Sequence, residues 1–344
     1  MFGLDELGLD LGTSMLHIVV KGKGVVLSDP AYVAYERETR EVTAMGEDAW
    51  RMYGKTPETM AVERPMRQGH IRSFDLVSKM LHSYLRKLIG RRAAFRPRLI
   101  LALPSGVVPS ERQTLIDICV DAGVRSVMPV DESVLSAIGC GMDITQHYGR
   151  MNVDIGGGRT SLSVFSLGKQ IVWMVTDVAG DRFDDAVIDY MRRKHNLVIG
   201  ERSAENLKMD IGTVRARGLS METLAYGRSL MTGLPREIKV TSEEMTEALE
   251  MPLLELANEL RKTIERTPPE LASDIFDNGI VLCGGGTRLY GLDDVLSEQL
   301  QIPIKSADEP ELSVCRGIEA LMMHPDDYED VELTGSIRES INQK

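Results

Sequence analysis

Three glycine-rich turns, each directly after a strand-like segment, are the residues of this sequence best suited to chemistry. They are Gly12-Thr13-Ser14, Gly156-Gly157-Gly158 and Gly284-Gly285-Gly286. Glycine has no Cβ and tolerates positive φ, so a tight glycine turn can bring several backbone N–H groups close to one anion. None of the turns matches a Walker A loop or the GxGxxG fingerprint, and each taken singly is more often a structural turn. Their recurrence after three strands predicts that together they bind phosphate groups.

Two aspartates, Asp10 and Asp154, stand near the ends of the strands that precede the first two turns. Mg²⁺ prefers oxygen ligands and keeps most of its waters, so one or two carboxylates are enough to hold it. The pattern therefore predicts a nucleoside triphosphate with magnesium. Residues 156–158 keep a second interpretation of their own, a hairpin that needs glycine only for its turn. Arg159 follows this turn and either adds a positive charge to the phosphates or points to solvent.

The surroundings of the first two turns repeat. "GLDLGTSMLHIVV" at residues 8–20 and "NVDIGGGRTSLSVF" at residues 152–165 share one plan. In both, a strand carries an aspartate near its end and continues through a glycine-rich turn into a second strand. Such a repeat indicates two similar domains that face a shared ligand.

Strand and helix patterns alternate around these turns, as in an α/β fold. Strands are predicted at residues 7–12, 15–20, 99–103 and 279–283. Helices are predicted at residues 75–90, 109–123 and 181–196, the second with Ser110 as its N-cap. Thr241 and Glu244 have the spacing of a capping box, which predicts a long helix from there to about Arg266.

Composition and charge exclude several classes of protein. The 344 residues include 40 Lys and Arg against 52 Asp and Glu, a net charge of −12, which argues against nucleic acid as a partner. No apolar run reaches the roughly 18 residues of a membrane span, and the first residues lack the features of a signal peptide. The cysteines, Cys119, Cys140, Cys283 and Cys315, have no metal-site spacing and are expected to be buried free thiols. We expect a cytoplasmic protein that touches a membrane at most peripherally.

The order and spacing of these motifs resemble those of the MreB family of bacterial actins along nearly the whole chain. Besides the three turns, the family-like segments are residues 20–30, 54–71, 197–212, 227–244, 266–275 and 279–293. The resemblance implies the actin fold, with two related domains around a nucleotide cleft. A first domain would comprise residues 1–143, with 313–344 returning to it, and a second would comprise 144–312. It further implies ATP and Mg²⁺ as cofactors, and assembly into filaments.

Site residues carried over from the family fall into four groups. Thr13, Ser14 and Met15 match the first phosphate loop, and Gly156, Gly157 and Gly158 match the second. The segment that reaches the nucleoside corresponds to Glu205, Asn206, Leu207 and Lys208, and the adenosine-side loop to Gly284, Gly285, Gly286, Thr287 and Arg288. Asp10 and Asp154 would act on the metal, partly through water. Glu132 matches the carboxylate that orients the attacking water; its alternative is a solvated glutamate at a helix start, favoured by the helix dipole.

Three positions depart from the family pattern. Met15 and Arg159 stand where the family usually has polar residues, in DLGTANT and GGGTT, and Ser133 replaces the proline of EEP. These changes suggest a divergent paralogue with altered nucleotide handling. Slow ATP hydrolysis linked to polymerisation is expected, and the alternative is a scaffold that binds nucleotide but hydrolyses little or none. A sugar or acetate kinase would need a second substrate motif, which we do not find. An Hsp70-type chaperone would need a substrate domain beyond residue 344.

The segment "RRAAFRPR" at residues 91–98 corresponds to the membrane-inserting loop of the family. Phe95 would enter the acyl boundary while the flanking arginines meet anionic headgroups, with Met1, Phe2 and Leu4 as a second apolar contact. The alternative is a solvated basic turn with one exposed aromatic residue. The resemblance implies, as partners, further copies of the chain or of a paralogue, the inner face of the cell membrane and membrane-bound cell-wall synthesis proteins. The implied role is the maintenance of rod or other cell shape.

Overall fold

The computed structural model describes residues 5–90 and 96–334. Its first five-stranded sheet has the order β10-β9-β1-β2-β3. The strands are β1 Glu6–Leu11, β2 Met15–Val20, β3 Gly24–Pro30, β9 Arg98–Leu103 and β10 Ser126–Asp131. β1 and β2 form an antiparallel hairpin, whereas β1, β9 and β10 are parallel. We call the part of the chain built on this sheet domain I.

The second five-stranded sheet repeats this arrangement, with the order β13-β12-β11-β17-β18. Its strands are β11 Arg150–Ile155, β12 Thr160–Ser166, β13 Lys169–Thr176, β17 Ile280–Cys283 and β18 Ile304–Ser306. β11 and β12 form the antiparallel hairpin, and β11, β17 and β18 are parallel. The part built on this sheet is domain II. The repeat predicted from residues 8–20 and 152–165 is therefore present as two equivalent hairpins, and the fold is the expected α/β, actin-like one.

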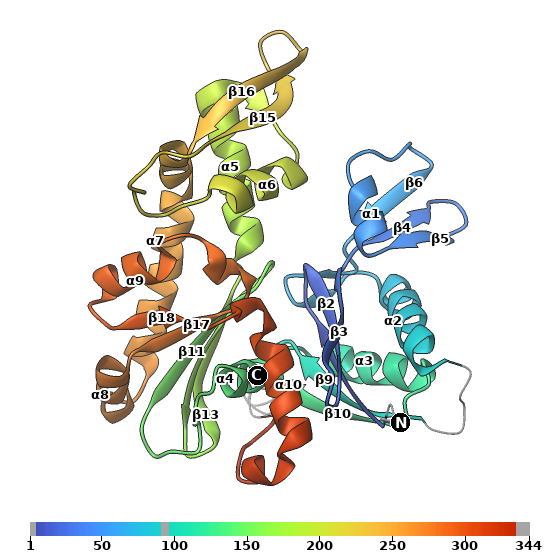
Figure 1. Ribbon diagram of the computed structural model, residues 1–344, viewed down its shortest axis with the longest axis vertical. Coiled ribbons are helices and arrows are strands. Elements are labelled where there is room, and N and C mark those ends of the chain that lie inside the picture. Colours follow the sequence, from blue (N-terminus) through green and yellow to red (C-terminus); the bar gives the residue numbers. More distant parts are fainter. Residues whose placement is uncertain (1–4, 91–95, 335–344) are drawn as a thin grey trace.

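Helices cover the two sheets and connect them (Figure 1). Domain I carries α2 Phe74–Ile89 and α3 Pro109–Asp121, and domain II carries α5 Gly180–His195, α7 Ser242–Arg266, α8 Pro269–Asn278 and α9 Leu292–Leu300. α4 Glu132–Gly139 and α10 Ser313–Met323 pack together between the sheets. Glycine permits this close packing, because a Cβ at Gly139 would overlap the carbonyl oxygen of Ser313. Helix α4 packs in apolar clusters with both sheets, so it does not mark where one domain ends and the other begins. The exact domain boundaries therefore stay a prediction.

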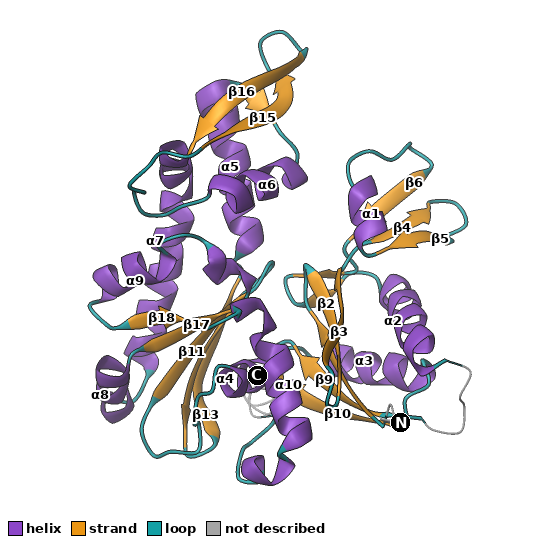
Figure 2. Cartoon of the chain, viewed as in Figure 1, coloured by secondary structure: helices purple, strands orange, loops and turns teal. Residues whose placement is uncertain are grey.

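A smaller unit extends each domain on the same side of the molecule (Figure 2). In domain I it comprises β4 Val33–Glu36, β5 Val42–Met45, β6 Met60–Glu63 and α1 Glu47–Met52. In domain II it comprises β14 Leu197–Val198, β15 Glu222–Ser229, β16 Pro235–Thr241 and α6 Glu201–Ile211. The short hairpin β7 Met66–Arg67 and β8 His70–Ile71 leads back to α2, and the 3₁₀ turns are η1 Gly285–Arg288, η2 Pro310–Leu312 and η3 Pro325–Tyr328.

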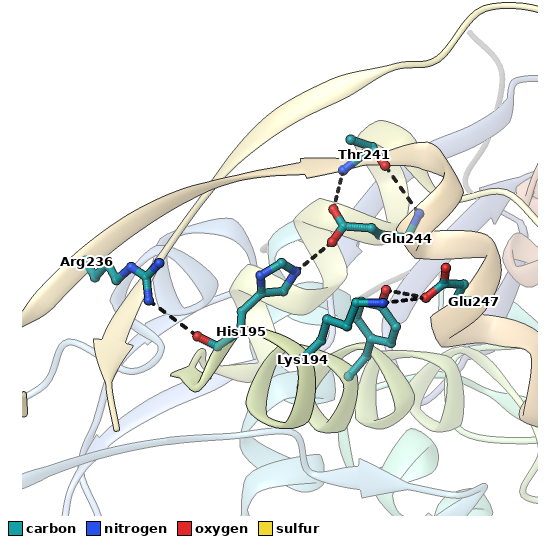
Figure 3. A network of polar contacts seen from close by, with 7 residues as sticks. Lys194, His195, Arg236, Thr241, Glu244 and Glu247 are labelled. Carbon is teal, nitrogen blue, oxygen red and sulfur yellow. Dashed lines mark hydrogen bonds and ion pairs between the residues drawn. The ribbon is translucent and has the colours of Figure 1, made fainter. Parts of the chain in front are cut away.

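The predicted capping box starts α7. The Glu244 carboxylate accepts the N–H of Thr241 over 3.0 Å, and the Thr241 hydroxyl accepts the N–H of Glu244 over 3.4 Å. Glu244 also contacts His195 Nε2 at 2.7 Å, and Tyr190 donates to Glu247 over 2.7 Å (Figure 3). These contacts join the end of α5 to the start of α7, so the cap also fixes how the two helices pack.

Most predicted elements are confirmed, and one cap is wrong. Helix α3 begins at Pro109 with Val108 before it, so Ser110 is not the N-cap. Proline suits the first helical position because its fixed φ is helical and its missing N–H would be unpaired there anyway. The four cysteines are free, as predicted, and all but the half-buried Cys140 are buried. Phe95 and Arg91 to Ala94, like Met1 to Leu4, lie outside the described residues.

Candidate functional site

A cavity of about 680 Å³ lies between the two domains. All three predicted glycine turns line it, although they are far apart in sequence. The predicted site residues in its lining are Asp10, Thr13, Ser14, Met15, Glu132, Asp154, Gly156, Gly157, Gly158, Glu205, Asn206, Lys208, Gly284, Gly285, Gly286 and Arg288. The two hairpins thus present their turns to one space, as the internal repeat predicted.

Two of the predicted binding residues do not reach the cavity. Leu207 is 3% exposed and belongs to the apolar core of domain II, because it lies on the opposite face of α6 from its neighbours Glu205 and Lys208. Thr287 is buried as well, and its hydroxyl donates to the carbonyl oxygen of Gly284 over 2.8 Å. The two side chains therefore do not line the cavity, and the assignment of these positions to the binding segments stays a prediction; the Thr287 hydroxyl stabilises the turn that lines the cavity.

The first two turns face each other closely across the cavity floor. A Cβ at Gly157 would overlap Ser14 Oγ, and one at Gly158 would lie 2.7 Å from Thr13 Cγ2. Each turn is closed in the same way, by the N–H of Gly12 donating to Met15 O and the N–H of Gly156 donating to Arg159 O, both over 2.9 Å. The glycines are therefore required for the approach of two turns, and a simple hairpin does not explain them.

The two aspartates occupy equivalent positions in β1 and β11. Burial raises the pKa of Asp10 to about 7, and burial together with the charge of Asp10 raises the pKa of Asp154 to about 7. One oxygen of Asp154, Oδ2, is buried without a hydrogen-bond partner. Two neighbouring carboxylates whose pKa values stay raised, even though Arg159 lowers that of Asp154, fit a divalent cation. The described residues offer no group of three or more His, Cys, Asp or Glu side chains that could hold a metal alone, so further oxygen ligands must come from phosphate or water.

Glu132 is the first residue of α4 and lines the cavity. Burial, and then the charge of Asp154, raises the pKa of Glu132 well above its ordinary value, while Arg159 lowers it. The alternative of a solvated helix-start glutamate is therefore wrong. Asp131 is the N-cap of α4 and accepts the Ser133 N–H over 2.9 Å, so the start of the helix is capped without Glu132. That leaves the Glu132 carboxylate free for a ligand or a water.

Lys208 and Arg288 line the cavity with their charges already paired. Lys208 Nζ lies 2.8 Å from Asp184 Oδ1 and donates to Gly180 O over 3.1 Å, and burial raises the pKa of Asp184 to about 7 despite that lysine. Arg288 makes two hydrogen bonds to Glu311, of 2.9 and 2.5 Å. Both residues therefore build the cavity wall as parts of ion pairs.

Several lining residues carry no recognisable motif and were missed from the sequence. Tyr32 and Trp50 come from domain I, and Phe183, Met209 and Arg217 come from domain II. The mouth of the cavity is bridged as well, since Tyr53 donates to Glu201 over 2.7 Å and the Arg202 guanidinium lies 4.0 Å from the centre of the Trp50 ring. The aromatic residues between positions 32 and 53 have no regular spacing, so the sequence did not predict their place at the cavity.

A protein-family model described as MreB/Mbl protein matches residues 4–330. The chain belongs to the MreB/Mbl family. It is 40% identical over 310 residues to the cell shape-determining protein Mbl of Bacillus cereus, covering 90% of this chain and 93% of that protein. It is 38% identical over 333 residues to the cell shape-determining protein MreB of Escherichia coli K12, covering 94% and 96%.

Solved structures agree with this family membership. MreB5 of Spiroplasma citri bound to ADP superimposes with a TM-score of 0.89 at 31% identity, covering 98% of both chains. The same protein bound to AMPPNP gives a TM-score of 0.89 at 32% identity, covering 93% of this chain and 96% of that one. The MamK double helical filament, at 18% identity and a TM-score of 0.77, shares the fold.

Two of the three departures of this MreB/Mbl chain from the family pattern line the cavity, and the third, Ser133, is buried. Met15 and Arg159 line the cavity, and the Ser133 hydroxyl donates to Asp131 over 2.7 Å. Arg159 is 7% exposed, and its Nε and Nη2 atoms are buried without hydrogen-bond partners. It packs against Gly69 of domain I, where a Cβ would overlap the guanidinium. Arg159 therefore points across the cleft, and the interpretation that it points to solvent is wrong.

Proposed function

We propose that this MreB/Mbl family chain binds ATP with Mg²⁺ in the cleft and assembles into filaments at the inner face of the cell membrane. Through these filaments it organises membrane-bound cell-wall synthesis proteins and maintains rod or other cell shape. The observation that carries nucleotide binding is the convergence of three glycine turns and two aspartates of raised pKa on one cavity. The likeness to MreB5 structures bound to ADP and AMPPNP supports the same ligand class.

In the proposed site the glycine turns hold phosphate groups through backbone N–H donors, and Asp10 and Asp154 hold the metal, directly or through water. Magnesium supplies positive charge that offsets the phosphates and the two carboxylates. Glu132 orients the attacking water for slow hydrolysis. The Arg159 guanidinium, whose charge is opposed by Glu132, Asp131 and Asp154, keeps Glu132 more ionised than burial alone would allow. These roles use residues whose side chains already line the cavity.

Filament formation rests on family membership and on a symmetry argument. A head-to-tail contact between identical subunits propagates into a filament when its rotation does not close a ring. Many weak membrane contacts along such a filament add to a stable attachment. The membrane contact itself is assigned from the sequence to Phe95 and its flanking arginines. Arg91, Arg92 and Phe95 lie outside the described residues, whereas Arg96 and Arg98 are described and exposed. No helix in the described ranges 5–90 and 96–334 has both the length and the apolar character to cross a membrane.

The test measures phosphate release and light scattering together, in purified protein with ATP, with and without Mg²⁺. We expect scattering to rise with Mg²⁺ and ATP, followed by slow phosphate release that depends on polymer. Polymer without phosphate release would support the alternative of a scaffold that binds nucleotide but does not hydrolyse it. Absence of both nucleotide binding and polymer across salt and lipid conditions would contradict the proposal.

A further inference from the structure

Two of the four cysteines meet beside the cleft. Cys140 ends α4, and Cys283 is the last residue of β17, directly before Gly284. Asn152 of β11 connects the two elements, because its amide donates to Ser136 Oγ over 2.8 Å and its Oδ1 lies 3.6 Å from Cys283 Sγ. Ser136 and Cys140 are four residues apart on α4 and so lie on one face. Asn152 therefore places the Cys140 and Cys283 thiols near one another, close enough that each shifts the pKa of the other.

The two thiols have different surroundings. Cys283 is 0% exposed, whereas Cys140 is half-buried, with its sulfur 3.5 Å from Ser313 Oγ. The neighbouring Cys283 lowers the pKa of Cys140. Cys119 and Cys315 are buried at 0% and 1% exposure, and burial raises the pKa of both. Because the accessible thiolate is the form that oxidants attack, Cys140 is the reactive member of the set.

We propose that Cys140 and Cys283 are a redox pair that a hydroperoxide converts into a reversible intramolecular disulfide. The Cys140 thiolate attacks one peroxide oxygen and breaks the O–O bond, which leaves a sulfenic acid on Cys140 and, after protonation, water or an alcohol. The Cys283 sulfur then attacks the Cys140 sulfur. The S–S bond forms, the S–O bond breaks, and the hydroxyl leaves with the Cys283 proton as water. Two electrons pass from the thiols to the peroxide.

The position of the pair gives this oxidation a consequence for the cleft. Helix α4 carries Glu132 at its first residue and Cys140 just after its last. Cys283 is the register partner of Asp154 in the neighbouring strand and leads into the Gly284 turn. A disulfide would therefore tie the helix of Glu132 to the strand that enters the third turn. This consequence rests on the proposed function, and it predicts that nucleotide leaves the oxidised cleft more slowly.

The direct test maps the disulfide. The full chain is treated with hydrogen peroxide under native conditions, free thiols are alkylated, and the protein is digested without reductant for mass spectrometry. We expect a peptide containing Cys140 linked to one containing Cys283, with a loss of about 2 Da for two hydrogens, and its disappearance after dithiothreitol. Cys119 and Cys315 should be alkylated only after unfolding. Only over-oxidised Cys140, links between two chains, or no reaction would each overturn the proposal.

Two single variants make the mapping specific. In Cys283→Ala, oxidation should stop at a Cys140 sulfenic acid, which dimedone traps. In the matched control Cys315→Ala, which removes a buried thiol outside the pair, the link should form as in the parent. If the Cys140–Cys283 link failed to form in Cys315→Ala as well, loosened packing around the pair, and not the geometry of the pair, would govern the reaction.

The functional arm compares release of a fluorescent ADP analogue from reduced and oxidised protein. We expect release to slow by roughly threefold or more on oxidation, and Cys140→Ala to show no response to peroxide. Unchanged release from protein with the mapped disulfide would contradict the effect on the cleft. If the reduced protein binds no nucleotide, the proposed function fails, while the mapped disulfide still decides whether the pair is redox-active.

Discussion

Arg64 and Asp181 form an ion pair of 2.7 Å across the mouth of the cleft, and their side chains are only 12% and 26% exposed. Arg64 follows β6 on the domain I side, and Asp181 lies in the first turn of α5 in domain II. The hydrogen bond and charge of Asp181 keep the pKa of Arg64 above its ordinary value, against the effect of its burial. The pair therefore joins the two domains beside the cavity, since Asp181 directly follows the lining residue Gly180.

Arg64→Ala should speed the release of bound nucleotide by about tenfold, which corresponds to about 1.4 kcal/mol. The reason is that the variant loses the charged contact that holds the cleft closed. Stopped-flow displacement of a fluorescent nucleotide measures the rate. Arg51→Ala is the matched control, because the Arg51 guanidinium pairs with Glu47 inside α1 and not with a side chain of domain II. Equal release from both variants would refute a closing role for Arg64.

Gly157→Ala should abolish nucleotide binding while the fold persists. The new Cβ would overlap Ser14 Oγ, so the two phosphate turns would have to separate. A larger side chain, as in Gly157→Val, should act in the same way. Calorimetric titration with ATP and Mg²⁺ measures binding, and circular dichroism checks the fold. Gly218→Ala is the control, since a Cβ there meets no atom within 4 Å. Parental affinity in Gly157→Ala would count against the site.

In the proposed mechanism the carboxylate form of Glu132 is the base, and its pKa is raised, so hydrolysis should increase with pH. Arg159→Thr removes a charge that lowers this pKa, so the rising limb of the rate profile should move to higher pH. Glu132→Gln should lose most of the phosphate release at every pH and retain nucleotide. Lys262→Thr, which removes an exposed charge on α7, should leave the profile in place. If the pH–rate profile of Arg159→Thr were identical to the parental one, Arg159 would have no influence on the pKa of Glu132.

Without ligand, the stability of the protein should fall as pH rises from about 4 to about 7. Asp10 and Asp154 keep their protons in this window when folded, because their pKa values are raised to about 7 from 3.8, and release them on unfolding. In Asp154→Asn the stability should fall less steeply as pH rises. ATP with Mg²⁺ should no longer stabilise this variant. Thermal melts between pH 5 and pH 8 test both. Asp143→Asn, whose carboxyl has a lowered pKa, should keep the parental slope over that range.

Cosedimentation with anionic liposomes should fall sharply when Phe95→Ser is combined with Arg91→Glu and Arg92→Glu. The apolar side chain would no longer enter the acyl region, and the new charges would be repelled by the headgroups. Light scattering with ATP checks that polymerisation is retained. Lys21→Glu together with Lys23→Glu controls for net charge in the exposed turn after β2. Equal pelleting of the parent and the Phe95 variant would place the membrane contact elsewhere.

Local sequence determined the parts of this protein that depend on neighbouring residues. The hairpins at Gly12 and Gly156 and the α7 capping box follow from turn chemistry, which acts over a few residues. The equivalence of Asp10 and Asp154 followed from the internal repeat. A strand that leads into the same type of turn places its aspartate at the same position in both hairpins.

Only the tertiary structure decided which side chains meet. Successive helix residues point about 100° apart, so the packing of α6 alone places Leu207 in the core and Lys208 at the cavity. Arg159 crosses the cleft because the other domain supplies the opposing carboxylates. The Arg64–Asp181 pair joins residues 117 positions apart. Such contacts depend on how two domains pack, a property that no local pattern encodes.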